Sequence, residues 1–308
     1  MNQISKEEKK DFLSNSDFSK EEIVNLIELA LKLKNKQTSL NIGGKVLGLV
    51  FDKASTRTRV SFQVAMSRLG GTTIDLNPGT TQIGRGEQIK DTARVLSRYC
   101  DVLAIRTFKH FDIKEYAKWA TIPVINALTD LEHPCQALAD FLTMKEEFGD
   151  FNKIKLTFIG DGNNVANSLI ICGSILGARI NIVCPNGFEP PKEILEDAKN
   201  LSENNSDILV TDNLIEGITE SNVLYTDVWS SMGEEGNKLI KEERFKGYTL
   251  DENLIDRAEN DVIIMHCLPA YRGKEISNAV FESSRSRIFN QAENRLHAQQ
   301  ALLFKLLQ

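Results

Sequence analysis

A short polar block has the residue types needed to hold a phosphate. Ser55-Thr56-Arg57-Thr58-Arg59 follows the apolar run Val46–Phe51, and apolar residues recur at helical spacing after it. This pattern predicts a buried strand, a turn and a helix start, where backbone N–H groups and the helix dipole favour an anion. A Ser N-cap followed by two solvated arginines is the simpler alternative. The block lacks the Gly-Lys-Ser/Thr ending of a Walker A loop.

Two further groups of donors follow predicted strands. Arg106 follows the strand 101–105, and His133-Pro134-Cys135-Gln136 follows the strand Val124–Ala127 and opens a helix. Ligands of parallel α/β sheets bind at the carboxyl ends of the strands, so we expect Ser55, Arg106, His133 and Gln136 to lie at one edge. Several fixed donors around one oxygen are what a developing oxyanion requires. Taken alone, His133 would be read as a loop histidine, and Cys135 as a packing residue.

The second half of the chain places an acid and a thiol after strands. Asp227 follows the predicted strand Asn222–Thr226, and His266-Cys267-Leu268-Pro269 follows the strand Asp261–Met265. A carboxylate at this edge could hold a cationic amine, and a paired thiol could help to orient or deprotonate it. The alternatives are an N-cap aspartate and a small buried cysteine, and His266 is interpreted as structural.

The turn Gly160-x-Gly162 resembles the start of a dinucleotide fingerprint. Two observations count against a nicotinamide-dependent dehydrogenase: Val165 occupies the third glycine position, and no acid follows the next strand at Cys184-Pro185-Asn186. Asn163 is interpreted as a turn residue.

The elements that must position these residues alternate between strands and helices, which is typical of parallel α/β sheets. A chain of 308 residues favours two domains. We predict an α/β fold of two domains, each a mainly parallel sheet flanked by helices, with the active site in the cleft between them. The first domain spans 1–148 and the second spans 149–291. A terminal helix from about Ala292 packs back onto the first domain and carries Arg295 near its start.

The overall composition narrows the function. A net charge of −6 argues against a general nucleic-acid or anionic-membrane surface. The five cysteines form no Cys-x-x-Cys pair, and we find no metal-ligand cluster, signal peptide or membrane-spanning run. We therefore expect a soluble cytoplasmic protein.

Ser55–Arg59 resembles the carbamoyl-phosphate signature of the aspartate/ornithine carbamoyltransferase family. Ser231-Met232-Gly233 and His266–Pro269 resemble the ornithine branch, and the resemblance extends over nearly the whole chain. It implies a transferase that moves the carbamoyl group of carbamoyl phosphate to the δ-amine of L-ornithine, giving L-citrulline and phosphate. It also implies a place in arginine and amino-acid biosynthesis, with the physiological direction left open. A carbamoyltransferase for a related amine such as putrescine is the closest alternative, which the intact Ser231–Gly233 loop disfavours.

The resemblance also assigns roles to individual residues, with no cofactor and no metal. It implies a homotrimer in which Gln82 contributes to the neighbouring site. The catalytic set is Arg106, His133, Gln136, Asp227 and Cys267. The carbamoyl-phosphate set is Ser55, Thr56, Arg57, Thr58, Gln82, Arg106, His133, Gln136, Cys267, Leu268 and Arg295. The ornithine set is Asn164, Asp227, Ser231 and Met232.

Overall fold

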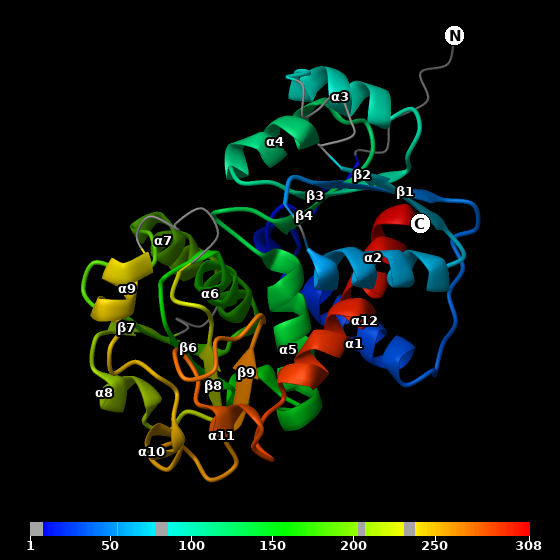
Figure 1. The fold of residues 1–308 in the computed structure, drawn as a ribbon. Helices are drawn as coiled ribbons and strands as arrows, with labels where there is room; N and C mark the ends of the chain where they lie inside the picture. The colour runs from blue at the N-terminus through cyan, green and yellow to red at the C-terminus, as the bar shows by residue number, and fades with distance from the viewer. Residues whose placement is uncertain (1–8, 54, 78–85, 203–206, 231–237) are drawn as a thin grey trace. The chain divides into compact units, whose positions relative to one another are not determined.

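A computed structural model describes residues 9–53, 55–77, 86–202, 207–230 and 238–308. It confirms the predicted α/β class, with two parallel sheets flanked by helices (Figure 1). The chain forms two compact units. Unit 1 comprises Met1–Phe18, Asn25–Cys135 and Leu296–Gln308, and unit 2 comprises Ser19–Val24 and Gln136–Arg295.

The first sheet has four parallel strands in the order β2-β1-β3-β4. They are β1 (Val46–Phe51), β2 (Thr72–Leu76), β3 (Val102–Arg106) and β4 (Val124–Leu128). The register pairs Phe51 with Arg106, so β1 and β3 end at the same level. Apolar residues of β1, β3 and β4 pack against α3 (Ile89–Leu96) and α4 (His110–Trp119), which cover one face of this sheet (Figure 1).

The second sheet has five parallel strands in the order β7-β6-β5-β8-β9. They are β5 (Lys155–Ile159), β6 (Arg179–Val183), β7 (Ile208–Thr211), β8 (Val223–Thr226) and β9 (Ile263–His266). Both faces of β5, β8 and β9 are covered, which explains why these strands read as continuous apolar runs. Because β5, β8 and β9 are neighbours in this order and run parallel, their carboxyl ends are adjacent.

A capping box opens the first helix, because Glu22 N–H donates to Ser19 Oγ and Ser19 N–H donates to Glu22 Oε2. The remaining described helices are α1 (Lys20–Lys34), α2 (Thr56–Arg68), α5 (Pro134–Phe148), α6 (Asn164–Leu176), α7 (Lys192–Leu201), α8 (Leu214–Ile218), α9 (Lys238–Arg244), α10 (Glu252–Ile255), α11 (Asn278–Phe281) and α12 (Ile288–Leu307).

The last helix begins earlier than the sequence predicted. The last helix, α12, begins at Ile288 rather than near Ala292, so Arg295 lies two turns inside it. Its placement is therefore not explained by a helix N-terminus. Arg295 is only 4% exposed, which makes it a buried cation instead. Among the described residues, no helix is both long enough and apolar enough to cross a membrane.

Candidate active site

The Ser55 block lies at the start of α2, where Ser55 precedes the helix and Thr56–Arg59 form its first turn. Ser55 occupies the N-cap position of α2, yet its side chain makes no capping hydrogen bond. Its hydroxyl instead accepts a hydrogen bond of 2.9 Å from Arg106 Nη1, which joins the ends of β1 and β3. Thr58 is buried, whereas Thr56 and Arg57 are exposed. The N-terminal N–H groups of α2, a hydroxyl and two guanidinium groups thus belong to one edge of the sheet, an arrangement suited to a phosphate.

Arg59 does not belong to this anion site. Its guanidinium pairs with Asp75 on β2 and lies 5.1 Å from the ring centre of Phe51. The carbamoyl-phosphate set predicted from the sequence likewise includes Arg57 and omits Arg59. Arg57 alone is the exposed arginine of the block, and Asp75 supplies the carboxylate that Arg59 needs.

His133 and Gln136 lie where β4 leads into α5. His133 is 5% exposed and directly precedes the helix, and Gln136 is 2% exposed in its first turn. Gln136 Oε1 accepts a hydrogen bond of 2.5 Å from Arg295 Nη1 on α12. The structure therefore brings together two residues of the predicted carbamoyl-phosphate set that lie far apart in the sequence.

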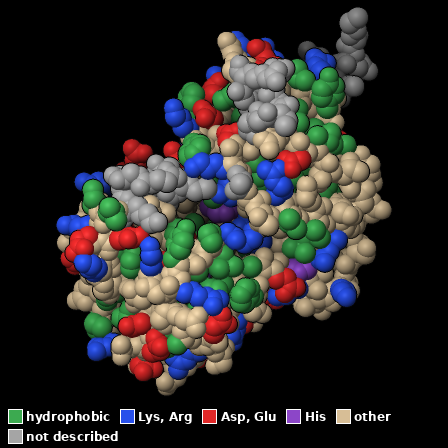
Figure 2. Space-filling model, viewed as in Figure 1, with side chains coloured by type: hydrophobic (Ala, Val, Ile, Leu, Met, Phe, Trp, Pro, Cys, Tyr) green, Lys and Arg blue, Asp and Glu red, His purple; other side chains and the backbone are tan. Residues whose placement is uncertain are grey.

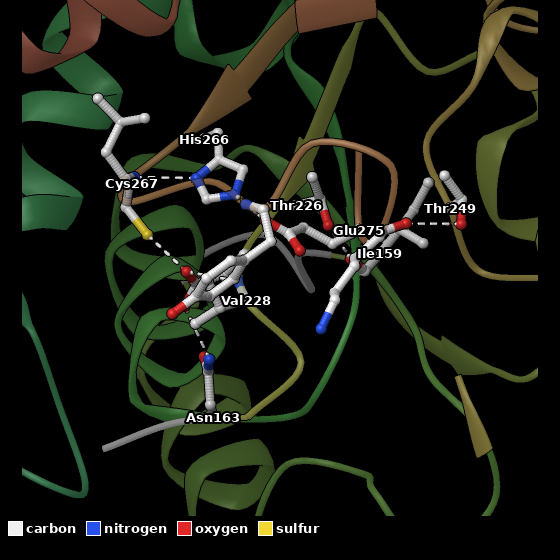
Figure 3. A network of polar contacts seen from close by, with 12 residues as sticks. Ile159, Asn163, Thr226, Val228, Thr249, His266, Cys267 and Glu275 are labelled. Atoms are coloured by element: carbon white, nitrogen blue, oxygen red, sulfur yellow. Dashed lines mark hydrogen bonds and ion pairs between the residues drawn. The ribbon is translucent and has the colours of Figure 1, made fainter. Parts of the chain in front are cut away.

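A buried carboxylate forms the centre of the second group. Asp227 follows β8 and is 6% exposed. Its Oδ1 accepts a hydrogen bond of 3.0 Å from Cys267 Sγ, after β9, and its Oδ2 accepts one of 2.9 Å from Asn163 Nδ2, after β5. Figure 3 shows the Cys267 sulfur and the Asn163 amide approaching this carboxylate from different elements. The predicted pairing of Asp227 with Cys267 is present.

The surroundings of Cys267 keep its sulfur protonated. Burial raises the pKa of the Cys267 thiol well above its usual range, and the charge and hydrogen bond of Asp227 raise it further. A contact with the Tyr225 hydroxyl acts in the opposite direction. A thiol with a raised pKa is a donor rather than a base. Of the pair, Asp227 is the group with an electron pair available for a proton.

His266 anchors the segment that carries Cys267. Its Nδ1 accepts from Leu268 N–H at 2.9 Å, and its Nε2 lies 3.1 Å from Glu275 Oε1 (Figure 3). Both ring nitrogens of His266 thus hold the turn at 267–269 in place. Within this turn, Leu268 adopts a φ of 62°. Asp227, His266 and Cys267 also offer ligand atoms within 4.8 Å of one another. A cation there would have to displace a hydrogen bond of His266, so this donor set fits a metal poorly.

The Gly160-x-Gly162 turn serves chain packing. Gly162 N–H donates to Phe188 O at 2.8 Å, and a Cβ on Gly162 would lie 2.3 Å from Pro190 N. The backbone of 188–190 therefore occupies the space that a pyrophosphate would need beside this glycine. Val165, at the third glycine position, is buried within α6. The turn presents Asn163 to Asp227 rather than binding a dinucleotide.

Of the predicted ornithine-site and inter-subunit residues, Asn164 is described, and three others lie outside the described residues. Asn164 is half-buried at the first position of α6, next to Asn163. Asn163, interpreted from the sequence as a turn residue, both caps α6 and donates to Asp227. Gln82, Ser231 and Met232 lie outside the described residues.

A buried polar cluster made by Asp140, Tyr225 and Gln291 was not predicted from the sequence. Asp140 lies four residues after Gln136, and the Gln136 Nε2 to Asp140 Oδ1 distance is 2.8 Å. That i,i+4 spacing on one helix was a usable signal. Gln291 is 151 residues away, and no local pattern indicates its contact with Asp140.

Two family models cover most of the chain. The carbamoyl-P binding domain of aspartate/ornithine carbamoyltransferase matches residues 10–146, and the Asp/Orn binding domain matches residues 152–306. The chain belongs to the aspartate/ornithine carbamoyltransferase family. This confirms the resemblance on which the sequence-based function rested.

Individual relatives agree with this family assignment. The ornithine carbamoyltransferase of Prochlorococcus marinus strain MIT 9312 is 64% identical, with 96% of each chain covered. That of Nostoc punctiforme is 51% identical, with 97% of each covered. Among solved structures, the anabolic ornithine carbamoyltransferase of Campylobacter jejuni has a TM-score of 0.91 at 42% identity, covering 96% of this chain and 98% of its own. The Pyrococcus furiosus enzyme has a TM-score of 0.90 at 43% identity, covering 96% of each chain.

Proposed function

We propose that this protein transfers the carbamoyl group of carbamoyl phosphate to the δ-amine of L-ornithine, releasing L-citrulline and phosphate. Whole-length similarity to ornithine carbamoyltransferases supports this reaction. The observation that carries it is the Asp227 carboxylate, held at its two oxygens by Cys267 and Asn163 at the edge of a parallel sheet. Such a group suits a substrate that arrives as a cationic amine.

The residues of the first sheet suit the donor substrate. We propose that Ser55, Thr56, Arg57 and Thr58, with Gln82, hold the phosphate, and that Arg106 contacts both the phosphate and the carbonyl oxygen. His133, Gln136 and Arg295 stabilise the charge that develops on that oxygen when the tetrahedral intermediate forms. The amide nitrogen of Gln136 carries two N–H groups, so it can donate to Asp140 and to a ligand together. The backbone at Cys267 and Leu268 completes the carbamoyl-phosphate set.

The residues of the second sheet suit the acceptor. An alkylamine has a pKa of about 10.4, so the site must remove a proton before attack. We propose that Asp227 binds the ammonium group and receives that proton, while the Cys267 thiol fixes the carboxylate by donating to it. The amine nitrogen then bonds to the carbonyl carbon, the bond from that carbon to the phosphate oxygen breaks, and the departing phosphate takes the surplus proton from the nitrogen. Asn164, Ser231 and Met232 hold the α-amino and carboxylate groups of ornithine.

The proposal also covers the compartment, the pathway and the domain bounds of the protein. We propose a cytoplasmic enzyme of arginine biosynthesis, with domains at 1–148 and 149–291 and the last helix belonging with the first. All five cysteines are free thiols, as a reducing compartment requires. Lys, Arg, Asp and Glu side chains are mixed over the described part of the face seen in Figure 2.

A citrulline-formation assay tests the activity. We expect turnover with carbamoyl phosphate and L-ornithine, and much lower kcat/KM with putrescine. Equal or better use of putrescine would favour the alternative acceptor. Indifference to both amines would contradict the proposal.

A hybrid assay tests the proposed homotrimer. Arg57→Ala and Gln82→Ala subunits are each expected to be inactive alone. Mixed trimers should recover part of the activity if Gln82 serves a neighbouring site, because some sites then receive intact residues from both chains. A monomeric mass in light scattering, or no recovery in mixed trimers, would contradict this arrangement.

A further inference from the structure

A buried carboxylate without a role in the proposed reaction lies behind the site residues of unit 2. Asp140 is on α5, one turn after Gln136, and is 0% exposed. Its Oδ1 accepts from Gln136 Nε2 at 2.8 Å and from Gln291 Nε2 at 2.7 Å. Its Oδ2 accepts from the Tyr225 hydroxyl at 3.2 Å. One carboxylate therefore receives donors from α5, β8 and α12.

Both glutamine amides that donate to Asp140 also accept a hydrogen bond at their oxygen, and these second bonds connect them to the proposed ligand residues. The Oε1 of Gln136 accepts from Arg295 Nη1, in the carbamoyl-phosphate set, at 2.5 Å. The Oε1 of Gln291 accepts from the backbone N–H of His266 at 2.9 Å, directly before Cys267. Asp140 is thus linked through one amide to the donor-substrate residues and through the other to the turn that carries the acceptor-site thiol.

The chemistry of the amide makes this linkage directional. A glutamine side chain donates from its nitrogen and accepts at its oxygen, whereas an ionised carboxylate only accepts. An ionised Asp140 therefore requires both glutamines to turn their nitrogens inward, which leaves each oxygen for its onward partner. We propose that Asp140 is a positioning residue that sets the orientation of Gln136 and Gln291. Through these two amides it fixes the positions of Arg295 and of the turn that carries Cys267. This inference rests on the proposed function.

The protonation of Asp140 gives this inference a measurable signature. Burial raises the pKa of Asp140 to about 7, opposed by the hydrogen bonds from Gln136 and Gln291 and by the charge of Arg295. Among the described residues, Tyr225 and Cys267 also interact with the charge of Asp140, and burial raises the pKa of each well above its usual range, so both stay neutral. Below that pKa, Asp140 carries a proton and must donate from one oxygen. On the acid side, Asp140 therefore no longer forces both glutamines to present their nitrogens.

Three variants separate orientation from simple packing. Asp140→Asn keeps an acceptor in the place of Oδ1 and has no charge to titrate, so we expect the fall of kcat/KM toward acid pH to flatten. Asp140→Ala removes the acceptor, and we expect roughly a hundredfold loss of kcat, as small displacements of catalytic groups cost about that much. Gln291→Leu breaks the chain of hydrogen bonds from Asp140 to His266 and leaves the Gln136 branch in place, so we expect KM for ornithine to rise while KM for carbamoyl phosphate stays within about twofold.

Thr143→Val is the matched control. It removes another buried contact between α5 and α12, the hydrogen bond of 2.9 Å from Asn294 Nδ2 to Thr143 Oγ1, and Asn294 Nδ2 also donates to Glu146, which is not one of the proposed ligand residues. We expect its kcat/KM and pH profile to match the parent protein. An Asp140→Asn variant with an unchanged acid limb, or a Thr143→Val variant with the losses of Asp140→Ala, would overturn the inference. A parent protein that makes no citrulline would instead refute the proposed function.

Discussion

The carboxyl edges of the two sheets differ in how they present their side chains. At the first, Arg57 is exposed, and one short segment supplies hydroxyls, a guanidinium and the N–H groups of α2. At the second, Asp227 is buried and is held by Asn163 and Cys267 from two other strand ends. An exposed cationic edge suits the capture of an anion, and a buried carboxylate with fixed neighbours suits control of a single proton. Substitutions at the first edge should therefore impair binding and charge stabilisation, whereas those at the second should impair proton control.

The largest effect is expected at the exposed edge. Arg57→Ala should lower kcat/KM by about a thousandfold or more, because it removes a full positive charge from the proposed phosphate site. The thermal midpoint should stay near that of the parent protein, since the side chain is exposed and contributes little to packing. Steady-state citrulline formation and a thermal melt measure the two quantities. Activity within tenfold of the parent would contradict the anion site.

The next largest effect is expected at the buried edge. Cys267→Ala removes the thiol that donates to Asp227, and we expect kcat to fall by about a hundredfold. Because the pKa of this thiol is well above its usual range, its ionisation should not shape the rate profile between about pH 6 and 8. Cys267→Ser, which keeps a donor, should recover part of the rate with an unchanged profile. Cys184→Ala, at another buried cysteine after β6, is the control and should remain active.

This difference explains which parts of the site the sequence predicts. The first edge is mostly contiguous in the chain, so strand, turn and helix patterns place Ser55 and Arg57 directly. The partner of Arg59 was missed because Asp75 belongs to the neighbouring strand, and register is not visible in a single segment. The second edge is assembled from strand ends about 40 to 60 residues apart. Strand order is a tertiary property, so the pairing of Asn163 with Asp227 could not be read from local spacing.

A moderate effect should show whether Asn163 is more than a helix cap. Asn163→Asp preserves the capping acceptor for Val165 and Ala166 but replaces the amide donor with a charge facing Asp227. We expect kcat/KM to fall by about tenfold or more, because two carboxylates in contact raise the pKa of one of them. Asn213→Asp is the matched control, since Asn213 caps α8 through the same two contacts and has no link to Asp227. Equal activities of the two variants would mean that Asn163 acts only as the N-cap of α6.

The smallest effect is expected at Arg59, and it sharpens the distinction between the two arginines of the block. Its guanidinium pairs with a partly exposed Asp75 and lies over Phe51, so Arg59→Ala should cost about 1 kcal/mol or less of unfolding free energy. Activity should stay within about twofold of the parent, because the charge is directed to β2 and away from the proposed phosphate site. Urea unfolding and citrulline formation measure both quantities. A loss comparable to that of Arg57→Ala would mean that the ion pair opens when the substrate binds, and that the block acts as a pair of arginines after all.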